Sequence, residues 1–279
     1  MQIQSMGGLG VQGQDKAVKS LNKTNRDLNK ILERLSTALR INRASDDAAG
    51  LSISEQLATQ VRGFKMADQN VTDAASALTI AEGAGNEVSG MLQRQRELAL
   101  QASNGTLSDQ QRQGIDVEYQ SLTQEIDRIT SAAQFNSQPV TNGQGLGSGN
   151  AQIQAGANAG DQIPMPATNM SSGALGITGT TVADQASAQA ALSKLDTALD
   201  TINNQRSTLG SMVNRLDSTR SNLSVAEINT QAAESVLRDQ DMAAGLAELT
   251  RQNLLLETGT QALSRFNEIS ANHLFGLLQ

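Results

Sequence analysis

Residues 17–39 read AVKSLNKTNRDLNKILERLSTAL, and the apolar side chains in this stretch recur in alternating steps of three and four. That spacing is typical of a helix that buries one narrow seam against another helix, as in a coiled coil. A lone helix cannot bury such a seam, so we expect this end of the chain to be covered by a partner. The predicted seam consists of Val18, Leu21, Asn25, Leu28, Leu32, Leu35 and Leu39.

The C-terminal end carries a second, less regular seam. Met242, Leu249, Leu256 and Leu263 stand seven residues apart. The companion positions hold Leu246, Asn253 and Thr260, of which two are polar. Asn25 and Asn253 either fix the register of the seam or face water. Ordering either end alone costs more backbone entropy than one seam returns, so we expect both ends to be disordered in a free monomer and helical in an assembly.

The composition favours long helices over a compact globule. Aromatic residues make up 2% of the 279 residues, Trp is absent, and the three prolines, Pro139, Pro164 and Pro166, all lie in the middle of the chain. Burial must therefore come from aliphatic side chains spread along extended interfaces. We predict a mainly α fold of long antiparallel helical rods or coiled coil, with a small β-hairpin region in the middle of the chain.

The sequence gives little support for catalysis. It has no Cys and a single His, His273, which excludes thiol chemistry, disulfides and any site with several His ligands. Asp46 and Asp47 could suggest a carboxylate pair, but a helix start explains them better because no base or nucleophile accompanies them. We expect no enzyme activity, no catalytic residue, no cofactor and no metal.

Charge is distributed unevenly along the chain. Residues 1–43 carry eight Lys or Arg against three acids, a net charge of +5, whereas residues 240–279 carry two Arg against four acids, a net charge of −2. The basic end lacks aromatic side chains for base stacking, so we predict no nucleic-acid partner. No run of 18 apolar residues occurs, and residues 1–16 lack the pattern of a cleaved signal, so we expect neither a membrane span nor a cleaved signal peptide.

Local signals predict the order of the elements. A long helix should begin after Ser45-Asp46-Asp47, with Ser45 as a cap, and end at Asn104-Gly105. A second helix should begin at Ser108 with a capping box to Gln111. Residues 136–181 are rich in Gly, Asn, Ser and Thr and predict turns with short strands around Ile153 and Ile177. Helix resumes near Asp184, with Leu195, Ile202, Leu209, Leu216 and Leu223 seven residues apart.

The run LRINRASDDAAGLSISEQL, residues 39–57, resembles bacterial flagellin. The resemblance continues through residues 78–106, 125–136, 153–163, 172–177 and 234–243. It implies paired terminal helices that form an inner tube, surrounded by a layer of helical rods, without the large surface domains that many family members insert. The implied domains are residues 1–43 (N-terminal inner-core helix), 44–136 (N-terminal rod helices), 137–181 (β-hairpin and turn segment), 182–242 (C-terminal rod helix) and 243–279 (C-terminal inner-core helix).

The resemblance also implies a function and partners. A flagellin is a secreted structural subunit that polymerises with itself into the flagellar filament and serves swimming. Export without a cleaved signal peptide, a secretion chaperone, and the cap and hook-junction proteins of the flagellum are implied as well. Two alternatives remain: a hook–filament junction protein, or a surface adhesin or ligand.

Residues 93–98, QRQREL, resemble the patch through which the vertebrate Toll-like flagellin receptor binds many flagellins. Position by position, Arg94 and Leu98 match that patch, and Glu118 matches on the next helix. The resemblance implies that the monomer is a receptor ligand. The other interpretation is that the same side chains pack one subunit on the next.

Overall fold

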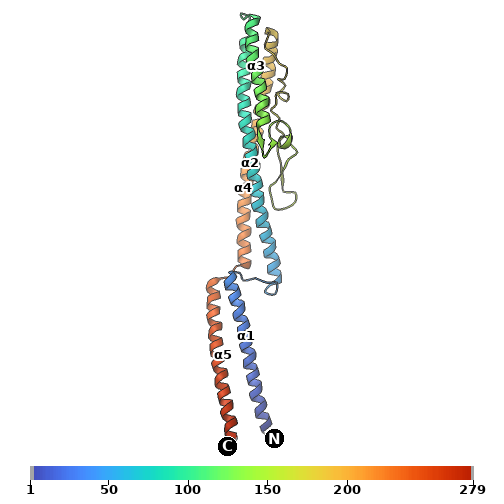
Figure 1. Ribbon diagram of the computed structural model, residues 1–279. Coiled ribbons are helices and arrows are strands. Elements are labelled where there is room, and N and C mark those ends of the chain that lie inside the picture. The colour runs from blue at the N-terminus through green and yellow to red at the C-terminus, as the bar shows by residue number, and fades with distance from the viewer. Residues whose placement is uncertain (1–2, 278–279) are drawn as a thin grey trace. The chain divides into compact units, whose positions relative to one another are not determined.

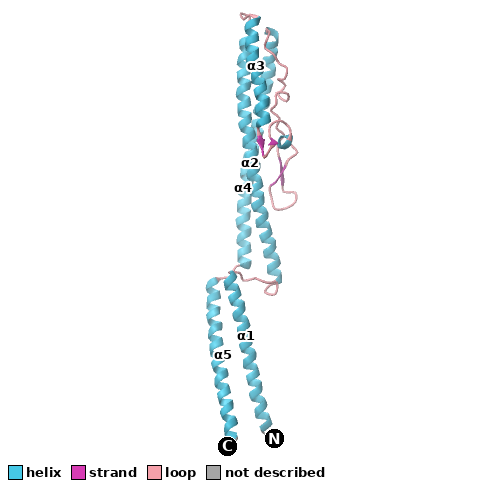
Figure 2. Ribbon diagram, viewed as in Figure 1, coloured by secondary structure: helices cyan, strands magenta, loops and turns pink. Residues whose placement is uncertain are grey.

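The computed structural model describes the backbone of residues 3–277 and the side chains of residues 13–269. Within the described residues there are five long helices, two small hairpins and one short 3-10 helix, η1 (Gly145–Ser148), which confirms the predicted fold class (Figures 1 and 2). The helices are α1 (Ile3–Thr37), α2 (Ala48–Ala102), α3 (Asp109–Ala132), α4 (Gln185–Arg238) and α5 (Met242–Leu277). None of them is long and apolar enough, over the described residues, to cross a membrane.

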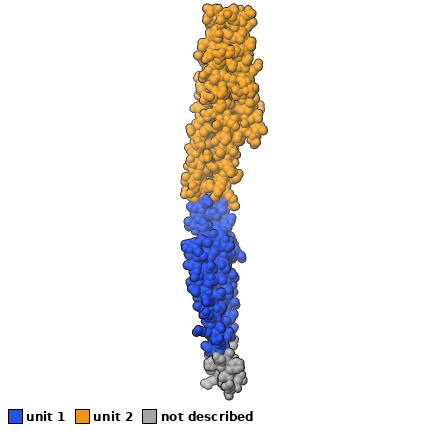
Figure 3. Space-filling view, turned by 60° about the vertical axis from the view of Figure 1, so that its left-hand side comes forward, with its two compact units in different colours: residues 1–58, 230–279 blue, residues 59–229 orange. Residues whose placement is uncertain are grey.

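The chain divides into two compact units (Figure 3). Unit 1 comprises residues 1–58 and 230–279, so it contains α1 and α5, the start of α2 and the end of α4. Unit 2 comprises residues 59–229 and contains the rest of α2 and α4, all of α3, and the hairpins.

The hydrophobic core of unit 2 lies between α2, α3 and α4. The five residues predicted at seven-residue spacing on α4, Leu195 to Leu223, are all buried, which confirms that seam. Facing them, α2 contributes a row that includes Val71, Leu78 and Leu92, and α3 contributes Tyr119 and Ile126. Small residues alternate with large ones along this core, so the helices can approach closely.

The helix ends follow the sequence signals, with one correction. The Ser108–Gln111 capping box is present at the start of α3. At the start of α2, however, the Asp47 carboxylate accepts the Gly50 N–H at 2.8 Å, so Asp47 caps this helix in the place predicted for Ser45. An acceptor one residue before the helix reaches the free N–H groups of its first turn, whereas Ser45 lies three residues before Ala48.

Two antiparallel hairpins form the β region. In the first, β1 (Gln134–Phe135) pairs with β2 (Gln138–Pro139), and in the second, β3 (Gln152–Gln154) pairs with β4 (Gln162–Pro164). The first hairpin therefore begins at Gln134, whereas the predicted β-hairpin and turn segment begins at residue 137. Its turn residues, Asn136 and Ser137, have φ of 49° and 62°, as in a two-residue hairpin turn of the primed type. Asn-Ser is a weaker turn signal than Asn-Gly, so the sequence did not reveal it.

The predicted strand around Ile153 is confirmed, whereas the one around Ile177 is wrong. Ile177 is fully buried but lies in a series of turns. Gly176 and Gly179 flank it with φ of 70° and 71°, and this left-handed backbone on both sides prevents an extended strand. Asp127 of α3 holds the turns in place, because its carboxylate accepts the Ser172 N–H at 2.8 Å.

Candidate assembly and receptor-binding surfaces

The helices α1 and α5 pair antiparallel within unit 1. Leu35 packs on Gly245 so closely that a Cβ there would lie 2.8 Å from Leu35 Cδ2. Fourteen residues earlier on α1, Leu21 packs on Gly259, which lies fourteen residues later on α5. At the far end Gln14 donates a hydrogen bond to Asn267 at 2.6 Å. The pairing register is therefore constant along the described length.

In each helix, one of the two rows of residues that form the inner face lies one position earlier than in the predicted seam. Leu21, Leu28 and Leu35 of α1 and Leu249, Leu256 and Leu263 of α5 are half-buried, as a seam requires. The companion rows lie one position earlier than predicted. They are Ala17, Thr24 and Ile31 on α1, and Gly245, Gln252 and Gly259 on α5.

The predicted companion residues, together with Met242 from the predicted main row of the C-terminal seam, lie outside the pair. Val18 is 42% exposed, Leu32 45%, Met242 44% and Leu246 54%. We call these four residues the outer flank. Asn25 and Asn253 are exposed as well, so they do not set the register of α1 against α5. On α5 the reason for the shift is size, because Gly245 and Gly259 leave room for Leu35 and Leu21 to pack closely, whereas Leu246 faces outward.

The run LRIN at residues 39–42 lies in a junction, residues 38–47, that contacts the segment before α5 within unit 1. The Arg40 N–H donates to the Arg238 carbonyl at 2.7 Å, and the Gln240 N–H donates to the Ala38 carbonyl at 2.9 Å. Leu39, half-buried, forms a β-bridge with Asp239. These main-chain bonds tie the segment after α1 to the segment before α5.

Asp46 closes the loop of this junction. Its carboxylate accepts the backbone N–H groups of Asn42 at 3.3 Å and Arg43 at 3.2 Å. Loss of hydration acts to raise the pKa of Asp46, but these two N–H donors, together with the positive charges of Arg34 and Lys30, outweigh it and lower the pKa. The Asp46 carboxylate is thus held ionised in a structural role.

The three residues of the predicted receptor patch occupy different environments in unit 2. Arg94 pairs with Glu118 at 2.7 Å and with Glu97 at 3.0 Å on an exposed face. The hydrogen bond to Glu118, and then that to Glu97, raises the pKa of Arg94. Leu98 is only 2% exposed and belongs to the core. The structure therefore brings Arg94 and Glu118 together on the surface and places Leu98 beneath them.

The sequence pattern did not identify several residues that the structure shows to be buried. Ile41 is buried in the junction, and Arg112 is buried beside the end of α2, where it donates to the Ala102 carbonyl at 2.9 Å. Gln95 of α2 is buried and donates from the core to Thr123 Oγ1 at 2.7 Å. Ile41 could have been found as one of the two large aliphatic residues of the loop, the other being Leu39. Nothing in the local pattern marks Arg112 as buried.

Within the described side chains, no group of three His, Cys, Asp or Glu residues is arranged to hold a metal ion. His273 lies outside the residues whose side chains are described.

Comparisons with known proteins cover most of the chain. Family models match at residues 12–146, described as the bacterial flagellin N-terminal helical region, and at residues 192–275, described as the bacterial flagellin C-terminal helical region. The flagellin of Halalkalibacterium halodurans is 42% identical over 241 residues, which cover 86% of this chain and 88% of that protein.

Two solved structures are similar. The crystal structure of Bacillus cereus flagellin aligns with a TM-score of 0.50 at 34% identity and covers 56% of this chain and 88% of its own. A flagellar hook-associated protein of Vibrio parahaemolyticus aligns with a TM-score of 0.57 at 18% identity, over 69% of this chain and 99% of its own, and at that identity the likeness concerns the fold alone. With both terminal regions matched and a relative of this similarity along most of its length, the chain belongs to the bacterial flagellin family.

Proposed function

We propose that this flagellin is the structural subunit of an extracellular flagellar filament that drives swimming. Flagellins are a family of structural filament proteins and not of enzymes. The observation that carries the proposal is the outer flank, because large apolar side chains on both terminal helices stay exposed after α1 and α5 have paired.

Neighbouring copies would bury the outer flank. Full burial of one large aliphatic side chain contributes about 1.5–3 kcal/mol, so the exposed fractions of the four residues correspond to about 3–6 kcal/mol per subunit. Each copy carries both helices, so the same contact can repeat without limit and produce a helical polymer. Val18, Leu32, Met242 and Leu246 would then join copies, whereas Leu21, Leu28, Leu35, Leu39, Leu249, Leu256 and Leu263 hold one copy together.

The division into domains follows from this role. Residues 1–43 and 243–279 would form the inner core of the filament, and residues 44–136, 137–181 and 182–242 the rod around it. Helix α1 ends at Thr37 and α5 begins at Met242, close to both boundaries. The junction at residues 38–47 would then lie where core and rod meet.

Export of the chain in an unfolded state, without a cleaved signal peptide, would precede assembly. The absence of Cys supports this part of the proposal, since no disulfide can hold the chain folded. A secretion chaperone that covers the exposed apolar side chains before export, and the cap and hook-junction proteins at the ends of the filament, would be its partners.

Electron microscopy of the purified full-length protein under polymerising conditions tests this function. Long helical filaments are expected. A chain that stays monomeric at high protein concentration and high salt would instead be a junction protein or a surface ligand.

A second function, recognition of the monomer by the vertebrate Toll-like flagellin receptor, is favoured by the exposed Arg94–Glu118 pair. Arg at the centre of an interface often contributes more than 1 kcal/mol, so Arg94→Ala should weaken signalling by soluble monomer about tenfold. Arg128→Ala is the matched control, because Arg128 also forms an exposed ion pair, with Glu125 at 2.6 Å. Equal signalling by both variants would exclude Arg94 as a contact.

A further inference from the structure

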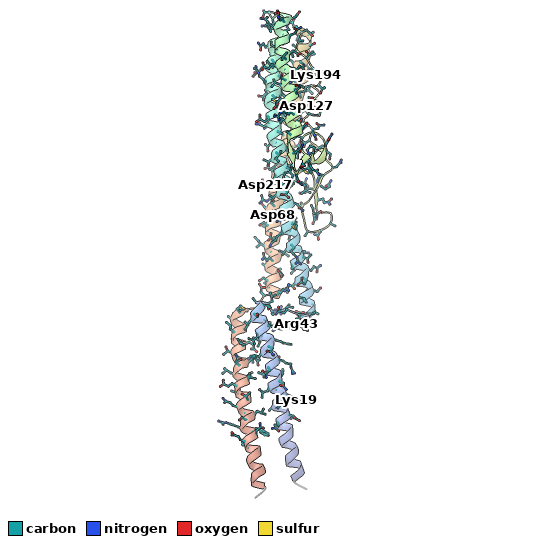
Figure 4. The ribbon with its side chains drawn as sticks, in the orientation of Figure 1. Lys19, Arg43, Asp68, Asp127, Lys194 and Asp217 are labelled. Carbon is teal, nitrogen blue, oxygen red and sulfur yellow. The ribbon has the colours of Figure 1, made fainter. Side chains whose placement is uncertain are left out.

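Five cationic residues form one stripe along α1. Lys16, Lys19, Lys23, Arg26 and Lys30 follow one another in steps of three and four, and all five are exposed. At about 100° per residue these positions fall within roughly 80° of the helix circumference. We call these five residues the basic stripe. Figure 4 labels Lys19 within it, and Arg43 in the junction.

Within the described part of the chain the basic stripe is not neutralised by close ion pairs, although the charge of Lys30 acts on Asp46. Among the side chains of residues 13–269, none of its five members takes part in an ion pair. Like charges three or four residues apart on a helix repel each other and destabilise it. The repulsion within the stripe therefore opposes the isolated α1, apart from what Asp15, Asp27 and Glu33 of the same helix offset.

Acidic residues are concentrated around the junction, beyond the C-terminal end of α1. Residues 1–37 carry six cations against three acids, a net charge of +3. The junction and its flanks, residues 38–58 and 234–241, carry six acids against three Arg, a net charge of −3. Asp239 and Asp241 are the exposed acids of this region outside any ion pair within the described side chains. Unit 1 is thus polarised, basic along α1 and acidic at the junction.

We propose that the basic stripe of one copy docks against the acidic junction of a second copy. This contact rests on the proposed function and adds an electrostatic contact to the apolar one. A second copy is the fitting occupant because it carries an acidic region of matching net charge, and because the chain outside residues 1–43 has a net charge of −12. Nucleic acid fits less well, since no aromatic residue lies among the five cations.

The proposal fixes how contacting copies are offset. Lys23, at the centre of the stripe, lies 14 residues before Thr37, where α1 ends just before the junction. At 1.5 Å per residue this helical separation corresponds to about 21 Å, so the two copies should be displaced along the helix axis by at least about that distance. Since the stripe and the junction are different surfaces, the contact is heterologous and can propagate.

Salt dependence and a charge-matched pair of variants test the contact. Lys19→Gln/Lys23→Gln removes two charges from the stripe, and Lys194→Gln/Arg215→Gln removes two exposed cations from unit 2 that also have no ion pair within the described side chains. The critical concentration for polymerisation, measured by sedimentation at 0.05 and 0.5 M NaCl, is the readout. At low salt the stripe variant should have a critical concentration about three- to tenfold above wild type, and less salt dependence, whereas the control should match wild type.

A charge-swap experiment tests the identity of the partner surface. Lys19→Glu/Lys23→Glu should polymerise poorly alone and co-polymerise with Asp239→Lys, and circular dichroism checks that each variant is folded. A stripe variant that behaves like its unit 2 control, or a mixture that shows no rescue, overturns the contact while leaving the filament function intact. Wild type that forms no filaments at either salt overturns both proposals.

Binding of wild type and of the stripe variant to double-stranded DNA and to vesicles containing anionic lipid completes the test. Weak binding by both, unchanged in the variant, is expected. Binding that is lost in the stripe variant, together with unchanged polymerisation, would assign the stripe to that anion and overturn the docking of copies.

Discussion

Truncation of Leu32 should separate assembly from folding. Leu32 lies on the outer flank of α1 with 45% of its surface exposed, and the inner-face residues Ile31 and Leu35 flank it on the helix. Leu32→Ala removes apolar surface that only a neighbouring copy would bury. Because complete burial of a Leu side chain is worth about 1.5–3 kcal/mol, the exposed fraction corresponds to about 0.7–1.4 kcal/mol per subunit.

That free energy sets the expected shift in polymerisation. Since about 1.4 kcal/mol is a factor of ten, the critical concentration should rise about three- to tenfold. Sedimentation of filaments from a dilution series measures it, and thermal unfolding of the monomer should show a midpoint no lower than that of wild type. Asn29→Ala is the control, because it places an Ala at a nearby exposed position of α1, favours the helix at least as much, and removes no apolar surface.

Two outcomes would refute this reasoning. An unchanged critical concentration for Leu32→Ala would mean that the outer flank stays exposed in the filament. A lower unfolding midpoint of the monomer would mean that Leu32 supports the α1–α5 pair, contrary to its exposed position.

Three further predictions concern unit 2. Tyr119→Phe removes the buried hydrogen bond to Thr180 Oγ1 at 2.8 Å and should destabilise unit 2 by about 0.5–1.5 kcal/mol in denaturant unfolding. A more stable variant would show that burying the hydroxyl destabilises the core. Burial raises the pKa of Tyr119, against the effect of that bond, so the wild-type phenol should titrate spectroscopically above its usual range. The Ser187 backbone N–H and hydroxyl lower the pKa of Asp184. The stability that the Asp184 carboxylate contributes is therefore present above its ordinary pKa of about 3.9 and is lost as the pH falls through the lower pKa of the folded state. Asp184→Asn should flatten the pH dependence of the thermal stability of unit 2 in that window, and an unaltered acid profile would count against Asp184 as the cap of α4. A fragment of residues 40–242 keeps the whole core of unit 2 and should be soluble and folded by circular dichroism but unable to polymerise, and filaments from this fragment would show that the terminal helices are dispensable.

The sequence predicted the long helices well because their signals are local. The capping box at Ser108 and the heptad from Leu195 to Leu223 depend on neighbours within a few residues, and both were confirmed. The position of the inner face in unit 1 depends instead on how closely α1 and α5 approach. The predicted spacing placed Val18 and Leu246 on that face, whereas the close approach of the helices selected the smaller Ala17 and Gly245.

The surface patch was predictable only in part. Resemblance located Arg94, Leu98 and Glu118, and the Arg94–Glu118 pair lies on the surface as expected. The burial of Leu98 depends on the facing rows of α3 and α4, which no local pattern around residues 93–98 encodes. The turns around Ile177 depended on two left-handed glycines, and an apolar residue between glycines resembles a short strand in sequence.

The main-chain contacts of residues 38–41 within the junction have a mechanical consequence. Its two hydrogen bonds, Arg40 to Arg238 and Gln240 to Ala38, join main chain to main chain on either side of the Leu39–Asp239 bridge. A pull on α1 would therefore be shared with the segment leading into α5 before it reached any long side chain. Because the backbone makes these bonds, most substitutions of the side chains around them would leave the load path unchanged.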